Sequence, residues 1–169
     1  MPNTYLFAFY LGGSHPKSNI ELHNLQFAVG SKISDCFDQL KNDWFGDLDG
    51  VHIDSYIMLD YVDGYKISVL DKVQNDQNSD LKLFCVHLGA KVENVFEEQH
   101  KTQFVLSKSA NEALLKVVKS VNDPKWDDVH RDMLYDVESV IDLSQKYSLE
   151  ITSADIDQTY KVVNFYKKI

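Results

Sequence analysis

The apolar positions of the chain predict two similar sets of short strands. A near-continuous apolar run, "TYLFAFYL", covers residues 4–11, and a second, "LKLFCVHL", covers residues 81–88. Runs of this length and density are typical of central strands. A Gly-containing turn and a polar segment follow each run. Shorter apolar stretches then predict a second strand at residues 25–29 in the first half and at residues 102–106 in the second.

A helix is predicted after each pair of strands, because apolar residues there recur at helical spacing. In the second half, "SANE" places Ser109 as N-cap with Glu112 three residues later, which is a capping box. In the first half, Gly46 is well placed to end the helix. The apolar stripe of that first helix consists of Ile33, Phe37, Leu40 and Trp44.

A hairpin is expected to close the unit. The segments "HIDSYIMLDY" and "YKISVL" flank Asp63-Gly64, a dipeptide suited to a type I′ turn. Each half therefore reads as a β-β-α-β-β unit, and the fold class is α+β, mostly antiparallel, with about eight strands and one helix per copy. The C-terminal segment "YKVVNFY" is rich in β-branched and aromatic residues, and we expect a strand there.

The sequence predicts an internal duplication of one structural unit. With an offset of 77 residues, "ELHNLQF" at 21–27 meets "EQHKTQF" at 98–104, and "VHID" at 51–54 meets "VHRD" at 129–132 after one inserted residue. Between the copies lies a polar segment almost devoid of apolar residues. We expect the two copies to pack as one compact unit, because isolated small sheets leave exposed edges. The expected divisions are a first copy at 1–70, a linker at 71–80, a diverged second copy at 81–153 and a C-terminal extension at 154–169.

Composition and charge narrow the possible partners. Apolar residues make up 44% of the chain and charged residues 25%, as in ordinary globular proteins. The net charge of −9 argues against nucleic acid, which needs a basic surface, and equally against an anionic membrane surface. The N-terminus lacks the features of a signal peptide, and two cysteines are too few for a disulfide framework. The cytoplasm is therefore the expected location.

Comparison of the two copies identifies the candidate site residues. In a strand, residues i and i+2 point to the same face, so His52 and Asp54 should lie side by side. With His23 they would supply two histidines and one carboxylate, a ligand set suited to Zn or Fe, although no residue is assigned to a metal. Four polar positions are kept in both copies: Glu21/Glu98, His23/His100, His52/His130 and Asp54/Asp132.

A structural explanation of these residues remains open. The His-x-Asp and Glu-x-His motifs can pin loops through hydrogen bonds, and duplication would keep such pinning twice. Gly12 and Gly13 could cradle a phosphate, but a tight turn explains them better, because no P-loop or dinucleotide pattern is present. Trp44 could line a ligand pocket or belong to the core. Cys36 and Cys85 stand opposite alanines of the other copy, which indicates buried positions rather than a reactive pair.

Several segments of the first copy resemble a known family. "FYLGG", "IELHNLQFAVG", "DWFGDLDGVHIDSY" and "VDGYKISVL" are similar to the small bacterial domain of unknown function (DUF) 1543, over residues 4–70 and more faintly in the second copy. The resemblance implies one or two copies of the domain. An acid commonly follows the histidine of the Glu-x-His in that family, whereas Asn24 stands here. The family implies no activity, cofactor or partner.

Two functional hypotheses follow. The first is a non-catalytic module that binds a protein or small molecule, with Gly12, Gly13, Glu21, His23, Trp44, His52 and Asp54 as the candidate ligand-binding residues. The second is a hydrolase or metal-assisted enzyme that uses His23, His52 and Asp54 as catalytic residues. Whether the protein is an enzyme, and with which cofactor, is left undecided by the sequence. Exposed sheet edges also suggest a homodimer.

Overall fold

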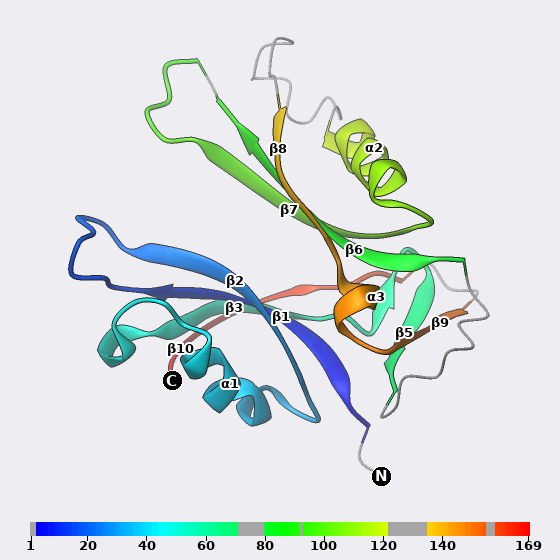
Figure 1. Cartoon of the computed structure of the whole chain (residues 1–169), viewed down its shortest axis with the longest axis horizontal. Coiled ribbons are helices and arrows are strands. Elements are labelled where there is room, and N and C mark those ends of the chain that lie inside the picture. The colour runs from blue at the N-terminus through cyan, green and yellow to red at the C-terminus, as the bar shows by residue number, and fades with distance from the viewer. Residues whose placement is uncertain (1–2, 71–79, 92, 122–134, 155–157) are drawn as a thin grey trace. The chain divides into compact units, whose positions relative to one another are not determined.

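The chain forms two compact units, which are described separately. In a computed structural model of the protein, residues 3–70, 80–91, 93–121, 135–154 and 158–169 are described. Unit 1 comprises Met1–Val69 and Thr152–Ile169, and unit 2 comprises Leu70–Ile151. The fold is α+β with mostly antiparallel sheets and few helices among these residues, as the sequence predicts (Figure 1). The predicted linker lies almost entirely outside the described residues.

The main sheet of unit 1 has the strand order β10-β3-β1-β2, with all neighbours antiparallel. β1 lies inside the sheet, and most of its residues are buried. The C-terminal segment is a strand, as expected, and it joins this sheet beside β3 (Figure 1). The strands are β1 (Tyr5–Gly13), β2 (Leu22–Gly30), β3 (His52–Met58) and β10 (Val162–Lys168).

The strands extend further than the apolar runs indicate. β1 includes Gly12 and Gly13, so the glycines do not form the predicted turn. β2 begins at Leu22, so most of "ELHNLQF" is strand rather than a polar connection. Backbone pairing with β1 continues through these polar positions, with Asn24, His23 and Leu22 opposite Leu11, Gly12 and Gly13. The Glu-x-His motif is therefore held rigidly by a sheet.

The predicted first helix is shorter than its apolar stripe. It begins as a 3-10 helix, η1 (Ile33–Cys36), continues as α1 (Phe37–Asn42), and ends well before Gly46. The Asp35 carboxylate accepts hydrogen bonds from the backbone N–H groups of Ser31 and Lys32, which fixes the start. Residues 42–46, at the end of the predicted helix, include asparagine, aspartate and glycine, which have low helix propensity. The stripe nevertheless packs on the sheet, since Leu40 and Trp44 are both buried.

The predicted hairpin forms around the predicted turn but belongs to a second sheet. Asp63 and Gly64 have φ of 53° and 80°, as a type I′ turn requires. β3 ends at Met58, and a separate short strand pairs with the outgoing one. The order of this sheet is β4-β5-β9, and its strands are β4 (Tyr61–Val62), β5 (Tyr65–Val69) and β9 (Leu149–Ser153).

Unit 2 has a three-stranded sheet in the order β7-β6-β8, covered by the helix α2 (Ala110–Val121). Ser109 Oγ accepts the Glu112 N–H at 3.3 Å, as the predicted capping box requires. The Glu112 carboxylate, however, accepts the N–H of Lys108 at 3.1 Å, one residue before the predicted donor. The other elements are β6 (Lys82–Ala90), β7 (Gln99–Ser107), β8 (Tyr135–Asp142) and a short helix, α3 (Leu143–Lys146), that the sequence did not predict.

The cores beneath the two helices use corresponding positions. In each unit the helix packs on one face of the sheet through apolar side chains from the central strand, its neighbour and the helix itself. Seven buried residues of unit 2 each lie 77 positions after a buried residue of unit 1. These pairs are Phe7/Phe84, Phe9/Val86, Leu11/Leu88, Ala28/Val105, Cys36/Ala113, Leu40/Val117 and Trp44/Val121.

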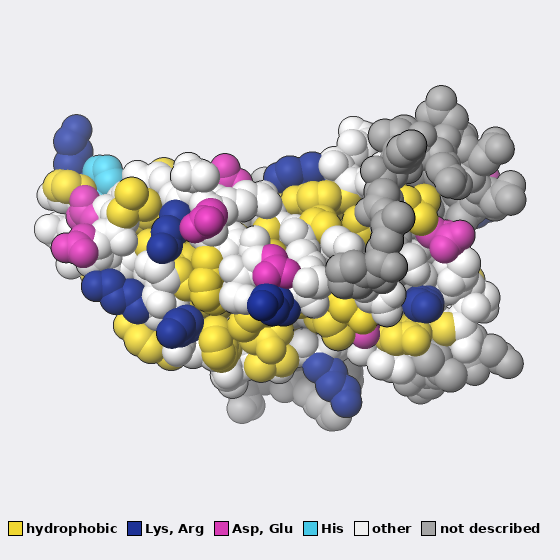
Figure 2. Space-filling model, turned by 90° about the horizontal axis from the view of Figure 1, so that it is seen from below, with side chains coloured by type: hydrophobic (Ala, Val, Ile, Leu, Met, Phe, Trp, Pro, Cys, Tyr) yellow, Lys and Arg dark blue, Asp and Glu magenta, His cyan; other side chains and the backbone are white. Residues whose placement is uncertain are grey.

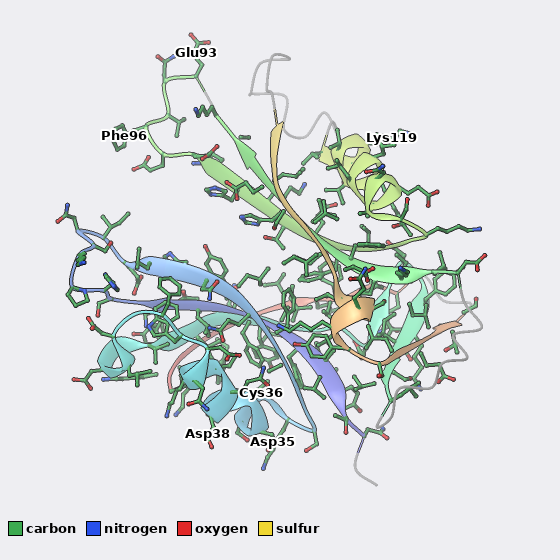
Figure 3. The ribbon with its side chains drawn as sticks, in the orientation of Figure 1. Asp35, Cys36, Asp38, Glu93, Phe96 and Lys119 are labelled. Atoms are coloured by element: carbon green, nitrogen blue, oxygen red, sulfur yellow. The ribbon has the colours of Figure 1, made fainter. Side chains whose placement is uncertain are left out.

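The surface of the described residues carries mixed charge. On the face drawn in Figure 2, side chains of both signs are interspersed with apolar ones. Phe96 projects from the loop between β6 and β7 and is 99% exposed (Figure 3). None of the described helices is long and apolar enough to span a membrane.

Leu11 and Leu48 provide a matched test of the unit 1 core, because Leu11 is fully buried under the helix and Leu48 is 59% exposed. We expect Leu11→Ala to lower the free energy of unfolding by about 2–5 kcal/mol, through lost burial and the cavity left behind. Leu48→Ala should change it by less than about 0.5 kcal/mol. Urea denaturation of both variants measures the difference, and equal effects would show that the core is assigned to the wrong face.

Candidate functional site

Three adjacent strands bring the predicted polar residues of unit 1 to one level of the sheet. Gly12 on the central strand pairs with His23 on β2 and with His52 on β3. Residues paired in this way share a face. His23 and His52 therefore flank the glycine on the face opposite the helix.

A β-bulge adds Asp54 to the same face. The register of β1 and β3 shifts between Tyr10, which pairs with Ser55, and Leu11, which pairs with Ile53. Asp54 is the extra residue of this bulge. Bulges re-aim a side chain and raise the local twist, and they are frequent next to functional sites. Here the bulge directs the Asp54 carboxylate toward both imidazoles.

The resulting group, Glu21, His23, His52 and Asp54, is called the unit 1 cluster. Each carboxylate spans the two imidazoles with its two oxygens. Glu21 lies 3.3 Å from His52 Nε2 through Oε1 and 3.6 Å from His23 Nε2 through Oε2. Asp54 lies 3.3 Å from His52 Nε2 through Oδ1 and 3.5 Å from His23 Nε2 through Oδ2. The convergence that the sequence raised as a question is thus present, at distances longer than typical N–H···O hydrogen bonds.

His52 is the buried member of the cluster, with 8% of its side chain exposed. Its Nδ1 lies 2.8 Å from the carbonyl oxygen of Gly50. Because a carbonyl can only accept, Nδ1 carries the proton, and the Nε2 side of the ring is turned to the two carboxylates. Both nitrogens of His52 are therefore engaged by the protein.

Gly12 provides the space that the cluster occupies. A Cβ at this position would lie 2.6 Å from His52 Nε2 and 2.9 Å from Asp54 Oδ2. A glycine inside a strand often marks a place where another group approaches the backbone closely. Gly12 therefore lies inside a strand and not in the turn expected from the sequence.

Gly13 and Trp44, which the sequence grouped with the cluster, lie on the other face of the sheet. A Cβ at Gly13 would lie 2.7 Å from Trp44 Cζ2, and Trp44 is 6% exposed within the core. The glycine therefore makes room for the indole ring beneath the helix. Among the described residues, the buried Trp44 Nε1 has no hydrogen-bond partner. These two residues contribute to packing and not to the cluster.

Aromatic rings border the unit 1 cluster. Tyr10 stacks on His23 with ring centroids 5.1 Å apart and planes 10° apart, and Tyr166 from β10 lies 4.7 Å from the His52 ring. Burial raises the pKa of Tyr10, and the negative charge of Asp54 adds to this. Tyr10 therefore remains a neutral phenol at physiological pH.

Unit 2 has a related group, the unit 2 cluster, which consists of His87, Glu98, His100 and Glu138. His130 and Asp132, the predicted equivalents of His52 and Asp54, lie outside the described residues. The register gives Glu138 the bulge position in β8 that Asp54 has in β3, because the bulge falls between Val137 and Ser139. The equivalence of His130 and Asp132 with His52 and Asp54 stays a prediction.

His87 enters the unit 2 cluster from the position that Tyr10 occupies in unit 1. Its ring stacks on His100 at 5.3 Å with planes 5° apart. Burial lowers the pKa of His87, with Glu138 opposing that shift and His100 adding to it. The search for residues kept in both copies missed His87 and Glu138, because neither is identical to its counterpart. Alternation along "LKLFCVHL" places His87 on the face of Gly89, which is the signal that could have found it.

The unit 1 cluster lies within a segment with known relatives. Residues 18–69 match the model of the family described as Domain of Unknown Function (DUF1543). The resemblance to DUF1543 is confirmed over this segment. All four members of the unit 1 cluster belong to the DUF1543 segment, whereas Gly12 precedes it and unit 2 lies beyond it.

Solved structures add information on the fold alone. The crystal structure of a protein Il1583 from Idiomarina loihiensis is similar, with a TM-score of 0.60 and 23% sequence identity. The similarity covers 98% of this chain and 97% of that chain. The comparison with curated proteins yields no match. The DUF1543 description is that of a domain of unknown function, so the chemistry must be argued from the two clusters.

The cysteines take no part in either cluster. Cys36, beside α1 (Figure 3), and Cys85 are both fully buried. Burial raises the pKa of Cys36 to about 11, with a contribution from the charge of Asp35, and burial raises that of Cys85 to about 12. Both are neutral thiols at physiological pH, in agreement with the sequence analysis.

The raised pKa values predict slow thiol modification. At pH 8 the folded protein should react with an aromatic disulfide reagent far more slowly than free cysteine does, because the thiolate is the reactive form. In urea both thiols should react at the free-cysteine rate. Mass spectrometry identifies the labelled residue, and fast native labelling of either cysteine at pH 8 would contradict its burial.

Gly12→Ala tests whether the missing Cβ is required by the unit 1 cluster. The added methyl group would collide with His52 and Asp54, and we expect a loss of about 1–3 kcal/mol in the free energy of unfolding together with a shift of the His52 ring signals in NMR spectra. Gly50→Ala is the control for the free energy of unfolding alone, since its Cβ would meet nothing closer than Ser14 Oγ at 3.6 Å, whereas its carbonyl contacts His52 Nδ1. Unchanged His52 signals in Gly12→Ala would contradict this role.

Proposed function

We propose that the protein is a binding module and that the unit 1 cluster binds the positively charged group of a small ligand. The observation that carries this proposal is the placement of two carboxylates on the Nε2 side of His52. With Nδ1–H donated to the Gly50 carbonyl, a neutral ring aims the Nε2 lone pair at Glu21 Oε1 and Asp54 Oδ1, each 3.3 Å away.

That arrangement is repulsive unless positive charge lies among these atoms. A lone pair and two carboxylate oxygens at this separation repel one another, and the burial of the His52 ring reduces the screening by water at its Nε2. A proton on Nε2 removes the repulsion, and so does a cationic group that inserts between the imidazoles and the carboxylates. Among the described residues, the buried Asp54 Oδ2 has no hydrogen-bond partner, since the 3.5 Å approach of His23 Nε2 is an ion-pair distance without hydrogen-bond geometry.

The accessibility of the cluster supports entry of a small ligand. His52 forms its floor, while the side chains of Glu21 and His23 are 49% and 38% exposed. A ligand can therefore reach Glu21 and His23 from solvent. The ring of Tyr166 beside His52 provides an aromatic face, which attracts organic cations as well.

The alternative, a hydrolase or metal-assisted enzyme, has less support from the same geometry. A general base needs a ring nitrogen that can reach the substrate. His52 offers none, because Nδ1 donates to the Gly50 carbonyl and the buried Nε2 faces the oxygens of two carboxylates, which stand where a substrate would have to approach. His23 is the more exposed candidate, but its neighbours among the described residues are two carboxylates and the Tyr10 ring, not a serine or cysteine nucleophile.

We also propose that the two units arose from one duplicated domain. The constant spacing of 77 residues between buried core positions supports this, as do the matching bulges beside Gly12 and Gly89. Cytoplasmic location, packing of the copies against each other and homodimer formation stay predictions from the sequence.

Binding of cations by unit 1 can be tested with methylammonium, ethane-1,2-diammonium and Zn²⁺ as probes. At least one of them should shift the ring nitrogen signals of His23 and His52 in long-range ¹H–¹⁵N spectra of the full chain. Asp54→Asn should weaken that probe about tenfold or more, because it removes one of the two charges that face the imidazoles.

Asp49→Asn is the matched control, since Asp49 is an exposed residue of the 3-10 helix η2 (Leu48–Gly50) and the change in net charge is the same. It should alter the apparent Kd less than about twofold. Equal weakening by both variants, or the absence of any shift at His23 and His52 with all three probes, would overturn the proposal.

A further inference from the structure

We propose that unit 2 contains a second and different site, in which His87, His100 and Glu138 bind a divalent transition-metal ion. One ligand atom from each residue lies within 4.8 Å of the other two. His87 Nε2 is 3.0 Å from Glu138 Oε2, and His100 Nε2 is 3.0 Å from Glu138 Oε1. Ligand atoms around a tetrahedral zinc ion with bonds of about 2.0–2.1 Å lie about 3.3 Å apart, so small side-chain movements suffice.

The donor set is selective for particular ions. Two imidazoles and one carboxylate are the ligands of many zinc sites and of non-haem iron sites, whereas calcium and magnesium prefer oxygen ligands alone. Glu98 can supply a further carboxylate, because its Oε2 is 3.9 Å from His100 Nε2. The site is therefore suited to Zn²⁺, Fe²⁺, Co²⁺ or Mn²⁺.

The backbone holds the three ligands rigidly. They come from three neighbouring strands of one sheet, His87 from β6, His100 from β7 and Glu138 from the bulge of β8. Sites on paired strands are positioned more precisely than sites on loops. Gly89 leaves the space in front of them, since a Cβ there would lie 2.9 Å from Glu138 Oε1 and 3.0 Å from Glu98 Oε1.

A hydroxyl group orients the His87 ring. His87 Nδ1 lies 2.7 Å from Thr102 Oγ1, which can accept the Nδ1 proton and so leaves the Nε2 lone pair for a metal. Metal-bound histidines usually donate their other N–H in this way. In unit 1 the corresponding pair is Tyr10 and Leu25, which provides neither an imidazole nor a hydroxyl partner to orient one. His87 and Thr102 are thus specific to unit 2.

The competing explanation is a purely structural one. In it, a single carboxylate accepts N–H hydrogen bonds from both imidazoles, with each proton on Nε2. Binding of a metal requires the opposite tautomer at His87, with the proton on Nδ1 toward Thr102. The two explanations therefore differ in which nitrogen of His87 carries the proton. They also differ in whether the signals of His87 and His100 change when metal is added.

The inference does not rest on the function proposed for unit 1, because the two clusters share no residue. Either can fail alone. Removal of a unit 1 carboxylate should leave metal binding in unit 2 intact, and removal of a unit 2 ligand should leave the response of His23 and His52 intact.

Titration of the full chain with ZnCl₂, followed by calorimetry and by long-range ¹H–¹⁵N spectra, tests the site. We expect the Nε2 signals of His87 and His100 to show coordination, with Nδ1 of His87 protonated. His87→Ala and Glu138→Gln should each weaken Zn²⁺ at this site at least a hundredfold, because each removes one of three ligands. Thr102→Val should weaken it about tenfold, as expected for a residue that orients a ligand.

Two variants serve as controls. His15→Ala removes a histidine outside both clusters, and Asp54→Asn alters only the unit 1 cluster; both should leave the Zn²⁺ affinity of unit 2 unchanged. Urea midpoints show whether each variant is folded, and the spectra of the wild-type chain decide the question without any variant. The inference is overturned if millimolar Zn²⁺ leaves the His87 and His100 signals unchanged, or if Glu138→Gln binds Zn²⁺ as tightly as the wild type.

Discussion

Gly12 pairs with His23 on one side and His52 on the other, and the absence of a Cβ there allows imidazoles and carboxylates to lie directly over the strand. A Cβ at this place would lie 2.6 Å from His52 Nε2, so any other residue would displace the His52 ring. Gly89 has the same relation to Glu98 and Glu138 in unit 2. The candidate chemistry of both units therefore depends on a glycine in the most buried strand of each sheet, where glycine is otherwise unfavourable.

Part of this arrangement could be predicted from the sequence. The i, i+2 spacing of His52 and Asp54, and the repeated Glu-x-His, correctly indicated a shared face. The position of Glu138 could not be read in the same way. A bulge adds one residue to a strand without any strong local signal, and the segment that contains His130 and Asp132 differs in length from its counterpart, so identity of letters was a poor guide to register.

The fold, like the site, has features that follow from the local sequence and others that depend on contacts between distant residues. Apolar runs predicted the central strands, and the Asp63-Gly64 turn and the Ser109 cap follow from local backbone chemistry. That β10 pairs with β3, joining the C-terminus to unit 1, depends on contacts between residues more than 100 positions apart. The sequence does not distinguish Gly13 from Gly12, although the two residues lie on opposite faces of β1. A glycine is needed at position 13 because the large ring of Trp44 packs against it. In unit 2 the smaller Val121 stands in place of Trp44, and Ala90 stands in place of Gly13.

The two clusters differ in a way that follows from their donors. In unit 1 each of the two imidazoles faces two carboxylates. The four N···O distances are 3.3–3.6 Å, which is longer than typical hydrogen bonds. In unit 2 a single carboxylate holds both imidazoles at 3.0 Å, and Thr102 fixes one of them. The looser cluster fits a larger or more hydrated cationic group, and the tighter one fits a bare ion at bonding distance. Tyr10 and His87 occupy corresponding positions in the two sheets. Descent of the units from one domain would make this exchange the change that gave unit 2 its third metal ligand and left unit 1 without one.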